Sequence, residues 1–290
     1  MVCAIVLDYY GAETTKKCLI SLIGQGLQTI YVLDNSQEGE AAASLESAVD
    51  QVRAQRADFA VEIISAGTNL GFAKGVNFVI AHDQQAQAPH DYYLLLNNDA
   101  VAGPGLVAGL LRALEHEPEA VLAAPRVVSS ESDEREQGVW YHRYFGLLYS
   151  RPGRFRFHYF TGCCLLLPSR LVSVSPLFDE AFFMYGEDTE LSWRLTRQGK
   201  KVVCATEAYV IHDYGPSVAR SSFFYEYHMA RGHLLLSLKT WLHPAEIPLL
   251  VLTKIVGLGG RAIVRCFRYR SLTPPFSLLV AWLPLRVNKT

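Results

Sequence analysis

The residues with the clearest chemical potential stand at positions 97–99, directly after the apolar run Leu94–Leu96. Two amides and a carboxylate follow one another there, as Asn97, Asn98 and Asp99. At a strand end, residues two apart project to the same side, so Asn97 and Asp99 can offer two oxygen ligands together. Such ligands suit Mg²⁺ or Mn²⁺, with water and phosphate oxygens completing the coordination shell. A plain turn is the alternative interpretation, because Asn and Asp are common turn residues.

Two further carboxylates end apolar segments nearer the N-terminus. Asp8 ends the segment VCAIVLD and Asp34 ends TIYVLD, and both segments are typical of buried strands. In sheets of parallel strands, ligands bind beyond the carboxyl ends of the strands. We therefore expect Asp8, Asp34 and Asp99 on one rim of a sheet.

The elements that must position these side chains alternate along the first part of the chain. Strand and helix patterns alternate four times, which predicts an α/β fold with a mostly parallel central sheet and helices on both faces. The expected strands are 2–10, 29–36, 59–67 and 91–99, and the expected helices are 14–26, 40–55, 71–85 and 103–118.

The second part of the chain has a different pattern. A strand is expected at 121–128, and an apolar strand at 160–172 that breaks at Pro168. The charged and aromatic stretch 129–158 predicts a flexible loop or edge region. The stretch 177–205 predicts a loop, a helix that begins near Glu187, and a strand.

A glycine-rich phosphate loop is not indicated. The first strand runs into DYYGAETT, which lacks GxGxxG, and no Walker lysine motif occurs. The other common way to hold a diphosphate is a divalent cation bound by carboxylates. This favours the metal interpretation of residues 97–99.

The composition excludes several classes of protein. Hydrophobic residues make up 50% and charged residues 19%, which argues against disorder. A net charge of −1 gives no argument for nucleic-acid binding. The six cysteines form no CxxC pair, which predicts free thiols in a reducing compartment rather than disulfides or a zinc site. We expect no signal peptide, because MVCAIVLDYY runs straight into a strand without a basic leader or a cleavage site. We expect no transmembrane helix, since no uninterrupted apolar run of about 18 residues occurs.

The C-terminal stretch is basic and apolar. From His243 onward, seven basic residues stand against one acidic residue. Four of the basic residues share one stripe of a predicted helix between apolar residues, and such a helix can lie on an anionic membrane surface. A packed helical subdomain or a dimer interface are the alternatives. The segment 276–285 is too short to span a bilayer. The four basic residues are Lys254, Arg261, Arg265 and Arg268.

Five ordered segments resemble a known family. They are VLDNS, NLGFAKGVN, LLLNNDA, TGCCLLLPSRL and FDEAFFMYGEDTELSWRLTRQGKKV. Over about residues 2–240 they resemble the family 2 inverting glycosyltransferases of the GT-A fold, and most of all bacterial rhamnosyltransferases. The resemblance implies a GT-A catalytic domain over 1–240, followed by a helical tail over 241–290.

The resemblance implies a nucleotide-sugar donor site. Asp34 would accept a hydrogen bond from the base of a uracil or thymine nucleotide, although a turn aspartate is the alternative. Asp99 would hold Mg²⁺ or Mn²⁺, with Asn97 in place of the family's first aspartate. His212 in VIHDYG would serve the metal or diphosphate, unless it is a structural histidine. Together with Asp8, the expected donor-site residues are Asn69, Gly71, Phe72, Asn77, Asn98, Thr161 and Gly162.

The resemblance also implies an acceptor site. Asp188 in YGEDTELSW would be the base that takes the proton of an acceptor hydroxyl as its oxygen attacks the anomeric carbon. Glu187 and Glu190 are the other candidates, and an acidic helix start favoured by the helix dipole would explain all three without catalysis. Trp193 and Arg194 could line the acceptor site, or Trp193 could be core. Arg231 could meet a phosphate or lie on the surface.

The expected activity is transfer of a sugar, with inversion, onto a glycan or lipid-linked glycan in cell-surface polysaccharide or lipopolysaccharide synthesis. The resemblance favours dTDP-L-rhamnose, and a UDP-sugar, galactofuranosyl or N-acetylhexosaminyl donor is the alternative. We expect a cytoplasmic enzyme at the inner face of the bacterial inner membrane. A non-catalytic nucleotide-sugar- or glycan-binding protein is the alternative from another class, but binding alone needs no base such as Asp188. A nucleotidyltransferase would carry a glycine- and arginine-rich loop, which is absent.

Overall fold

The computed structural model describes residues 1–36, 39–55, 58–129, 132–136, 139–173, 175–212 and 222–285. The chain forms two compact units, and each is described by itself. Unit 1 comprises Met1–Gln137, Thr161–Phe178 and Gly199–Gly215, and unit 2 comprises Gly138–Phe160, Asp179–Gln198 and Pro216–Thr290. The segments 138–160 and 179–198 group with the C-terminal helices in unit 2, and the expected domain boundary at residue 240 stays a prediction.

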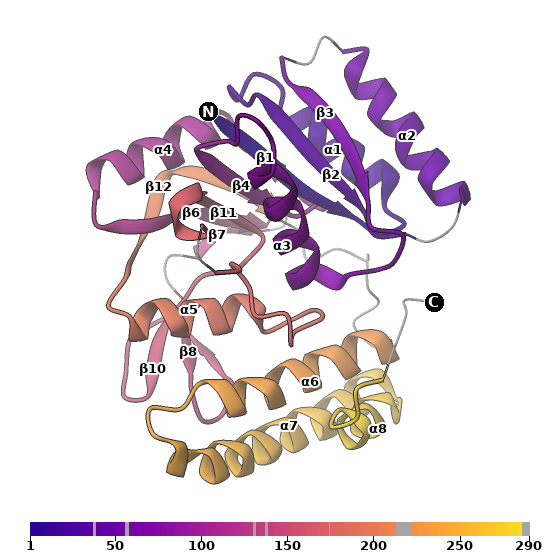
Figure 1. The fold of residues 1–290 in the computed structure, drawn as a ribbon. Helices are drawn as coiled ribbons and strands as arrows, with labels where there is room; N and C mark the ends of the chain where they lie inside the picture. Colours follow the sequence, from indigo (N-terminus) through magenta and orange to yellow (C-terminus); the bar gives the residue numbers. More distant parts are fainter. Residues whose placement is uncertain are drawn as a thin grey trace. The chain divides into compact units, whose positions relative to one another are not determined.

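Within the described residues, unit 1 contains a nine-stranded sheet in the order β3-β2-β1-β4-β11-β6-β12-β5, with β7 paired to β6 (Figure 1). Neighbouring strands among β1 to β4 run parallel, as do β6 and β12, whereas β11 runs antiparallel to β4 and β6. The predicted mostly parallel sheet is therefore confirmed. The strands are β1 (Val2–Asp8), β2 (Thr29–Asp34), β3 (Ala60–Ser65), β4 (Tyr92–Leu96), β5 (Ala100–Ala102), β6 (Ala120–Ser129), β7 (Ser132–Glu136), β11 (Cys164–Pro168) and β12 (Lys201–His212).

Helices cover both faces of this sheet, as the alternating pattern predicted. Val2, Ala4 and Val6 of β1 belong to one apolar cluster with residues of α1, α2 and α4. The opposite face meets α3, where a Cβ on Gly75 would lie 2.8 Å from Leu7 Cδ2. The helices are α1 (Ala12–Ser21), α2 (Gly39–Arg53), α3 (Gly71–Gln84) and α4 (Leu106–His116), and a short 3₁₀ helix, η1 (Ser169–Leu171), follows β11.

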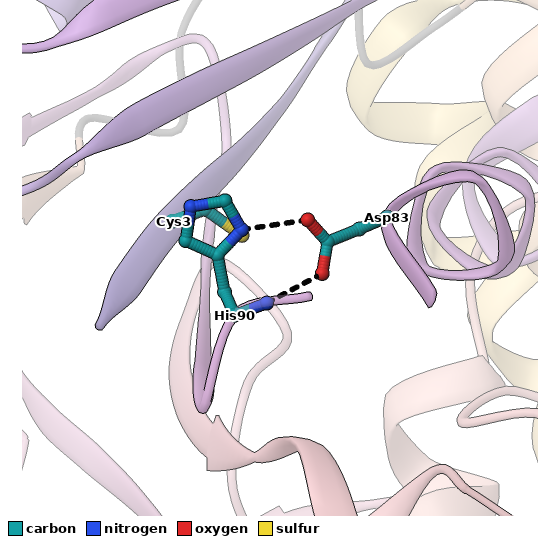
Figure 2. A group of neighbouring side chains, drawn as sticks. All are labelled: Cys3, Asp83 and His90. Atoms are coloured by element: carbon teal, nitrogen blue, oxygen red, sulfur yellow. Dashed lines mark hydrogen bonds and ion pairs between the residues drawn. The ribbon is translucent and has the colours of Figure 1, made fainter. Parts of the chain in front are cut away.

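A buried polar network joins α3 to the sheet at Asp83 (Figure 2). Asp83 Oδ1 lies 2.6 Å from Nδ1 of His90 and accepts a hydrogen bond from Tyr31, and its Oδ2 accepts bonds from His90 N and the Tyr93 hydroxyl. Burial alone would raise the pKa of Asp83, but the hydrogen bonds hold it below its ordinary value.

Among the described residues, Cys3, Asp83 and His90 are the one group of three whose ligand atoms are close enough to hold a metal ion. The hydrogen-bond donors around Asp83 already occupy both of its oxygens. Burial raises the pKa of the Cys3 thiol, which disfavours the thiolate that a metal needs. The group is thus a structural network. All six cysteines lie within the described ranges and are free, as predicted.

Unit 2 contradicts one prediction. The stretch 129–158 was expected to be a loop or edge region, but it contains β7 in unit 1 and most of a three-stranded antiparallel sheet, β10-β8-β9, in unit 2. These strands are two to five residues long, which is too short for an alternating pattern to be recognised in the sequence. Packing of Tyr141 against Phe157 stabilises the sheet of unit 2. Its strands are β8 (Val139–His142), β9 (Leu148–Tyr149) and β10 (Arg156–Tyr159).

The rest of unit 2 is helical. Helix α5 (Glu187–Arg197) begins where the sequence predicted it, and α6 (Phe223–Lys239) packs against both C-terminal helices (Figure 1). These are α7 (Ile247–Tyr269), which follows the 3₁₀ helix η2 (Pro244–Glu246), and α8 (Thr273–Val280). The predicted helical tail is therefore present.

The prediction that no helix spans a membrane stays a prediction, although one described helix is long and apolar enough to do so. The segment Pro244–Tyr269 is 26 residues long, contains an 18-residue window with a mean hydropathy of 1.7, and could cross a membrane on length and composition alone. The sequence criterion required an uninterrupted apolar run, and Lys254 interrupts this one. Lys254 is fully buried within unit 2.

Candidate active site

One edge of the sheet in unit 1 collects most of the predicted donor-site residues. Asp8 and Asp34 are paired in register at the ends of β1 and β2. Strand β4 lies on the other side of β1 and ends just before residues 97–99. Because β11 is antiparallel, its first residue, Cys164, pairs with Leu96, and Thr161 and Gly162 precede it at the same edge.

Asp8 and Asn98 connect the elements behind this edge. Asp8 is 1% exposed and accepts hydrogen bonds from the Thr15 hydroxyl and from Gly11 N. Asn98 Nδ2 donates to Thr15 Oγ1 at 3.0 Å and lies 3.5 Å from Asp8 Oδ1. Burial raises the pKa of Asp8 above its ordinary value. These contacts fix the start of α1 against the turn at 97–99, and a nucleotide contact for either residue stays a prediction.

Asp34 forms a local turn at the end of β2. Its Oδ1 accepts hydrogen bonds from Ser36 N at 2.8 Å and from the Ser36 hydroxyl, and the side chain is buried. The next residue, Asn35, was not among the predicted site residues. Its amide donates to Gly71 O at 3.2 Å and accepts from Leu70 N at 3.1 Å. Asn35 therefore fixes the NLGF segment beside Asp34, a contact that no local sequence pattern reveals.

The NLGFAKGVN segment begins α3. Asn69 Oδ1 accepts a hydrogen bond from Gly71 N, and Gly71 has a φ of 71°, a conformation that glycine adopts without steric cost. The ring of Phe72 lies 5.6 Å from that of Phe178. The Asn77 amide bonds to both N and O of Phe178, at 3.1 and 2.8 Å. Asn77 thus holds the 178 segment in place, and its predicted nucleotide contact stays a prediction.

Asp99 and His212 form the candidate metal site. Asp99 Oδ1 lies 3.1 Å from His212 Nε2, and His212 pairs with Ala100 across β12 and β5. Their side chains are 22% and 9% exposed. One carboxylate and one imidazole are ligands that Mn²⁺ accepts, and so small a protein set leaves coordination positions for diphosphate oxygens. The residues present therefore fit the expected cation.

Asn97 and Thr161 have backbone contacts beside this pair. Asn97 N donates to Cys163 O at 2.8 Å, and Thr161 Oγ1 accepts from Cys163 N at 3.4 Å. The side chain of Asn97 is half-buried. A role for the Asn97 amide as a metal ligand stays a prediction.

The candidate base lies in unit 2, at the first turn of α5. Tyr185 and Gly186 both have positive φ angles, 65° and 101°, immediately before this helix. A Cβ on Gly232 of α6 would lie only 2.2 Å from Tyr185 O. The close approach that Gly232 permits therefore fixes the turn that presents Glu187 and Asp188.

Asp188 is held in a defined orientation. Tyr159, at the end of β10, donates a hydrogen bond to Asp188 Oδ2 at 2.8 Å. Thr189 N donates to Oδ1 at 2.7 Å. The residue is only partly buried, so this carboxylate is oriented and accessible, as a general base must be. No sequence pattern indicated a role for Tyr159, because it directly follows the stretch 129–158 that was expected to be a loop or edge region.

Glu187 has a different environment. It is 6% exposed, and its Oε2 has no hydrogen-bond partner among the described residues. Burial and the neighbouring Asp188 raise the pKa of Glu187 to about 8. A carboxyl group that keeps its proton at neutral pH cannot accept one, so the geometry favours Asp188 as the base. Glu190 instead pairs with Arg194 at 3.2 Å.

The remaining predicted acceptor residues have structural partners. Trp193 is 8% exposed and packs between Phe157, with ring centroids 5.2 Å apart, and the guanidinium of Arg143. It is therefore part of the core of unit 2. Arg231 donates a hydrogen bond to Ala281 O at 3.1 Å, just beyond the end of α8.

The mixed sheet with helices on both faces defines a GT-A-like glycosyltransferase fold, and solved structures share it. A mannosyltransferase, PcManGT from Pyrobaculum calidifontis, determined with GDP-Man and Mn²⁺, superposes with a TM-score of 0.57 at 15% identity, covering 97% of this chain and 86% of that one. GalNAc-T7, determined with UDP, GalNAc and Mn²⁺, also gives 0.57, at 13% identity over 94% and 59%.

The chain belongs to glycosyl transferase family 2, which residues 3–173 match. Its fold is that of these solved structures. Two curated relatives, both N-acetylglucosaminyl-diphospho-decaprenol L-rhamnosyltransferases of Mycobacterium tuberculosis (strains CDC 1551 / Oshkosh and ATCC 25618 / H37Rv), are each 26% identical over 187 residues. The match covers 55% of this chain and 61% of theirs, so it spans about three fifths of their length.

Proposed function

We propose that this glycosyltransferase transfers L-rhamnose from dTDP-L-rhamnose onto a hydroxyl of a glycan or lipid-linked glycan in cell-surface polysaccharide synthesis. The observation that carries the choice of sugar is the 26% identity to the two mycobacterial L-rhamnosyltransferases. Their acceptor is an N-acetylglucosaminyl diphospholipid, which favours an acceptor of the same chemical kind here. The reaction would then take place at the cytoplasmic face of a membrane.

The donor would be held by the sheet edge of unit 1. Asp99 and His212 would bind Mg²⁺ or Mn²⁺, which when bound supplies positive charge against the leaving diphosphate. Asp34 would accept a hydrogen bond from the base of the nucleotide. Both solved structures with a similar fold were determined with Mn²⁺ and a nucleotide or nucleotide sugar, which supports this assignment.

The acceptor would be activated from unit 2. The acceptor oxygen attacks the anomeric carbon as the bond from that carbon to the diphosphate oxygen breaks, and dTDP leaves from the opposite face. The proton of the acceptor hydroxyl passes to Asp188, and Tyr159 holds the carboxylate in place. Attack opposite the leaving group inverts the configuration once.

The test is turnover by the purified full chain. dTDP-L-rhamnose, a UDP-galactofuranose and a UDP-N-acetylhexosamine would each be offered with an N-acetylglucosaminyl diphospholipid analogue, with Mn²⁺ or with EDTA. Product from dTDP-L-rhamnose alone, with inverted configuration by NMR, supports the proposal. Product from a UDP-sugar instead would show that the donor is that UDP-sugar and not dTDP-L-rhamnose. Donor binding without product under all conditions would favour the non-catalytic alternative.

A further inference from the structure

Helices α7 and α8 of unit 2 expose an apolar surface that the glycosyltransferase activity does not use. Leu252, Val256, Ile263 and Phe267 recur at spacings of four, seven and four residues, so they lie on one side of α7. Their exposed fractions run from 59% to 80%. Leu279 of α8 is 76% exposed. We call these five residues, which mark the surface, the α7–α8 apolar face.

Two basic residues of α7, Lys254 and Arg265, lie on its other side, contrary to the expectation of a basic membrane-facing stripe. Lys254 is fully buried and donates a hydrogen bond to the Tyr141 hydroxyl. Arg265 forms an ion pair with Glu226 of α6. Lys254 and Arg265 thus have partners inside unit 2, and the side of α7 that carries the α7–α8 apolar face stays exposed.

We propose that the α7–α8 apolar face lies in the interfacial region of an anionic lipid bilayer, with the axis of α7 parallel to the membrane. Monomeric soluble proteins rarely expose so many adjacent large apolar side chains. An amphipathic helix gains free energy by burying such a face at the boundary between headgroups and acyl chains. At 23 residues, α7 would offer the membrane a contact about 35 Å long.

The charges around the face identify the partner as anionic lipid. Residues 247–285 contain no aspartate or glutamate. Arg268 and Arg270 are exposed at the C-terminal end of α7, where they can meet anionic headgroups. Trp282 is 47% exposed beyond α8, and tryptophan is enriched at membrane interfaces. A surface without acidic residues is complementary to anionic lipid headgroups, and it is less complementary to a partner protein with the usual mixture of charges.

The same contacts argue for an in-plane helix and against a spanning one, although α7 is long enough to cross a bilayer. A spanning arrangement would separate Lys254 from Tyr141 and Arg265 from Glu226, and it would place both cations in hydrocarbon. An in-plane arrangement leaves both pairs intact.

The test is flotation of the full chain with vesicles of phosphatidylcholine, with or without phosphatidylglycerol. The wild type should float with the anionic vesicles. The double variant Phe267→Glu/Leu279→Glu, at two exposed positions, should lower the partition coefficient at least about tenfold. The control Ile20→Glu/Ala43→Glu introduces the same two charges at exposed positions of α1 and α2 in unit 1 and should float like the wild type. Arg268→Glu/Arg270→Glu should weaken binding to anionic vesicles far more than to neutral ones.

Three outcomes would overturn the proposal. The first is unchanged flotation of the Phe267→Glu/Leu279→Glu variant. The second is a wild type that does not float but forms a dimer by light scattering, which this variant dissociates. The third is resistance of the bound wild type to extraction with alkaline carbonate, which indicates a spanning helix. Hydrolysis of the soluble donor by each variant should match the wild type. This readout separates failure of membrane binding from failure of the proposed transferase function.

Discussion

The hydroxyl of Tyr159 donates a hydrogen bond of 2.8 Å to Oδ2 of Asp188. The two residues lie 29 positions apart, at the end of β10 and the start of α5, and both belong to unit 2. This contact holds the carboxylate in one orientation. Glu187, one residue earlier, has instead a buried oxygen without a hydrogen-bond partner in the described part of the chain.

Asp188→Asn should lower kcat about 10²- to 10⁴-fold, because the amide cannot accept the proton of the acceptor. Glu187→Gln should retain most of the activity, since Glu187 is already protonated at neutral pH and its amide replacement has nearly the same shape. Steady-state kinetics with saturating donor measure both variants. Equal losses of kcat in the two variants would contradict the assignment of the base to Asp188 rather than Glu187.

Tyr159→Phe should lower kcat about tenfold, the loss expected when a carboxylate loses one hydrogen bond of about 1.5 kcal/mol. The charged form of Asp188 loses a donor, so the acidic limb of the pH–rate profile should move to higher pH. A purely structural role for Tyr159 predicts lower stability with an unmoved profile. Thermal unfolding and the pH profile of kcat together decide between these roles.

Asp99→Ala and His212→Ala should each weaken Mn²⁺ binding in the presence of dTDP by at least about tenfold, since each removes one of few protein ligands. Thermal shift with dTDP, with and without Mn²⁺, measures the effect, because a ligand of the folded state raises Tm. Asn97→Ala tests the neighbouring amide. A full Mn²⁺-dependent shift in Asn97→Ala would show that its side chain is not a ligand, and a full shift in Asp99→Ala would refute the metal site.

Stability should depend on pH through Glu187. Its carboxyl ionises near its ordinary value of 4.5 in the unfolded chain and at about 8 in the folded one. Between these values the folded state binds the additional proton, so this residue makes stability fall as pH rises. Glu187→Gln lacks this dependence, and its Tm relative to the wild type should rise from about pH 5 to about pH 8. Denaturation at several pH values tests this, and a constant difference would contradict the buried environment of Glu187.

Gly232→Ala should destabilise the protein by about 1–3 kcal/mol or more, because the new Cβ would overlap Tyr185 O, a backbone atom that cannot easily move. Activity should fall as well, since the Tyr185–Gly186 turn presents Asp188. Gly259→Ala, within α7, has open space around its Cβ and should stabilise by about 0.5–1 kcal/mol. Urea denaturation of both variants provides the comparison, and a stable Gly232→Ala would disprove the tight contact.

Much of unit 1 was determined by local sequence alone. The strands before Asp8, Asp34 and Asp99 are apolar runs that end in polar residues, and the helices between them have their own apolar periodicity. Parallel pairing then places the strand ends at one edge, so the sequence predicts their neighbourhood without any knowledge of distant contacts. The start of α5 near Glu187 was predicted equally well.

Tertiary structure decided those features that depend on contacts between residues far apart in the sequence. The short strands of unit 2 are held by cross-strand packing, as between Tyr141 and Phe157, and not by long runs of strong β-formers. Periodicity placed Lys254 and Arg265 on one stripe of α7, but it could not tell which side of the helix would be buried. That choice was made by Tyr141 and Glu226, 113 and 39 residues earlier in the chain, because a buried cation is stable only where a distant group satisfies it.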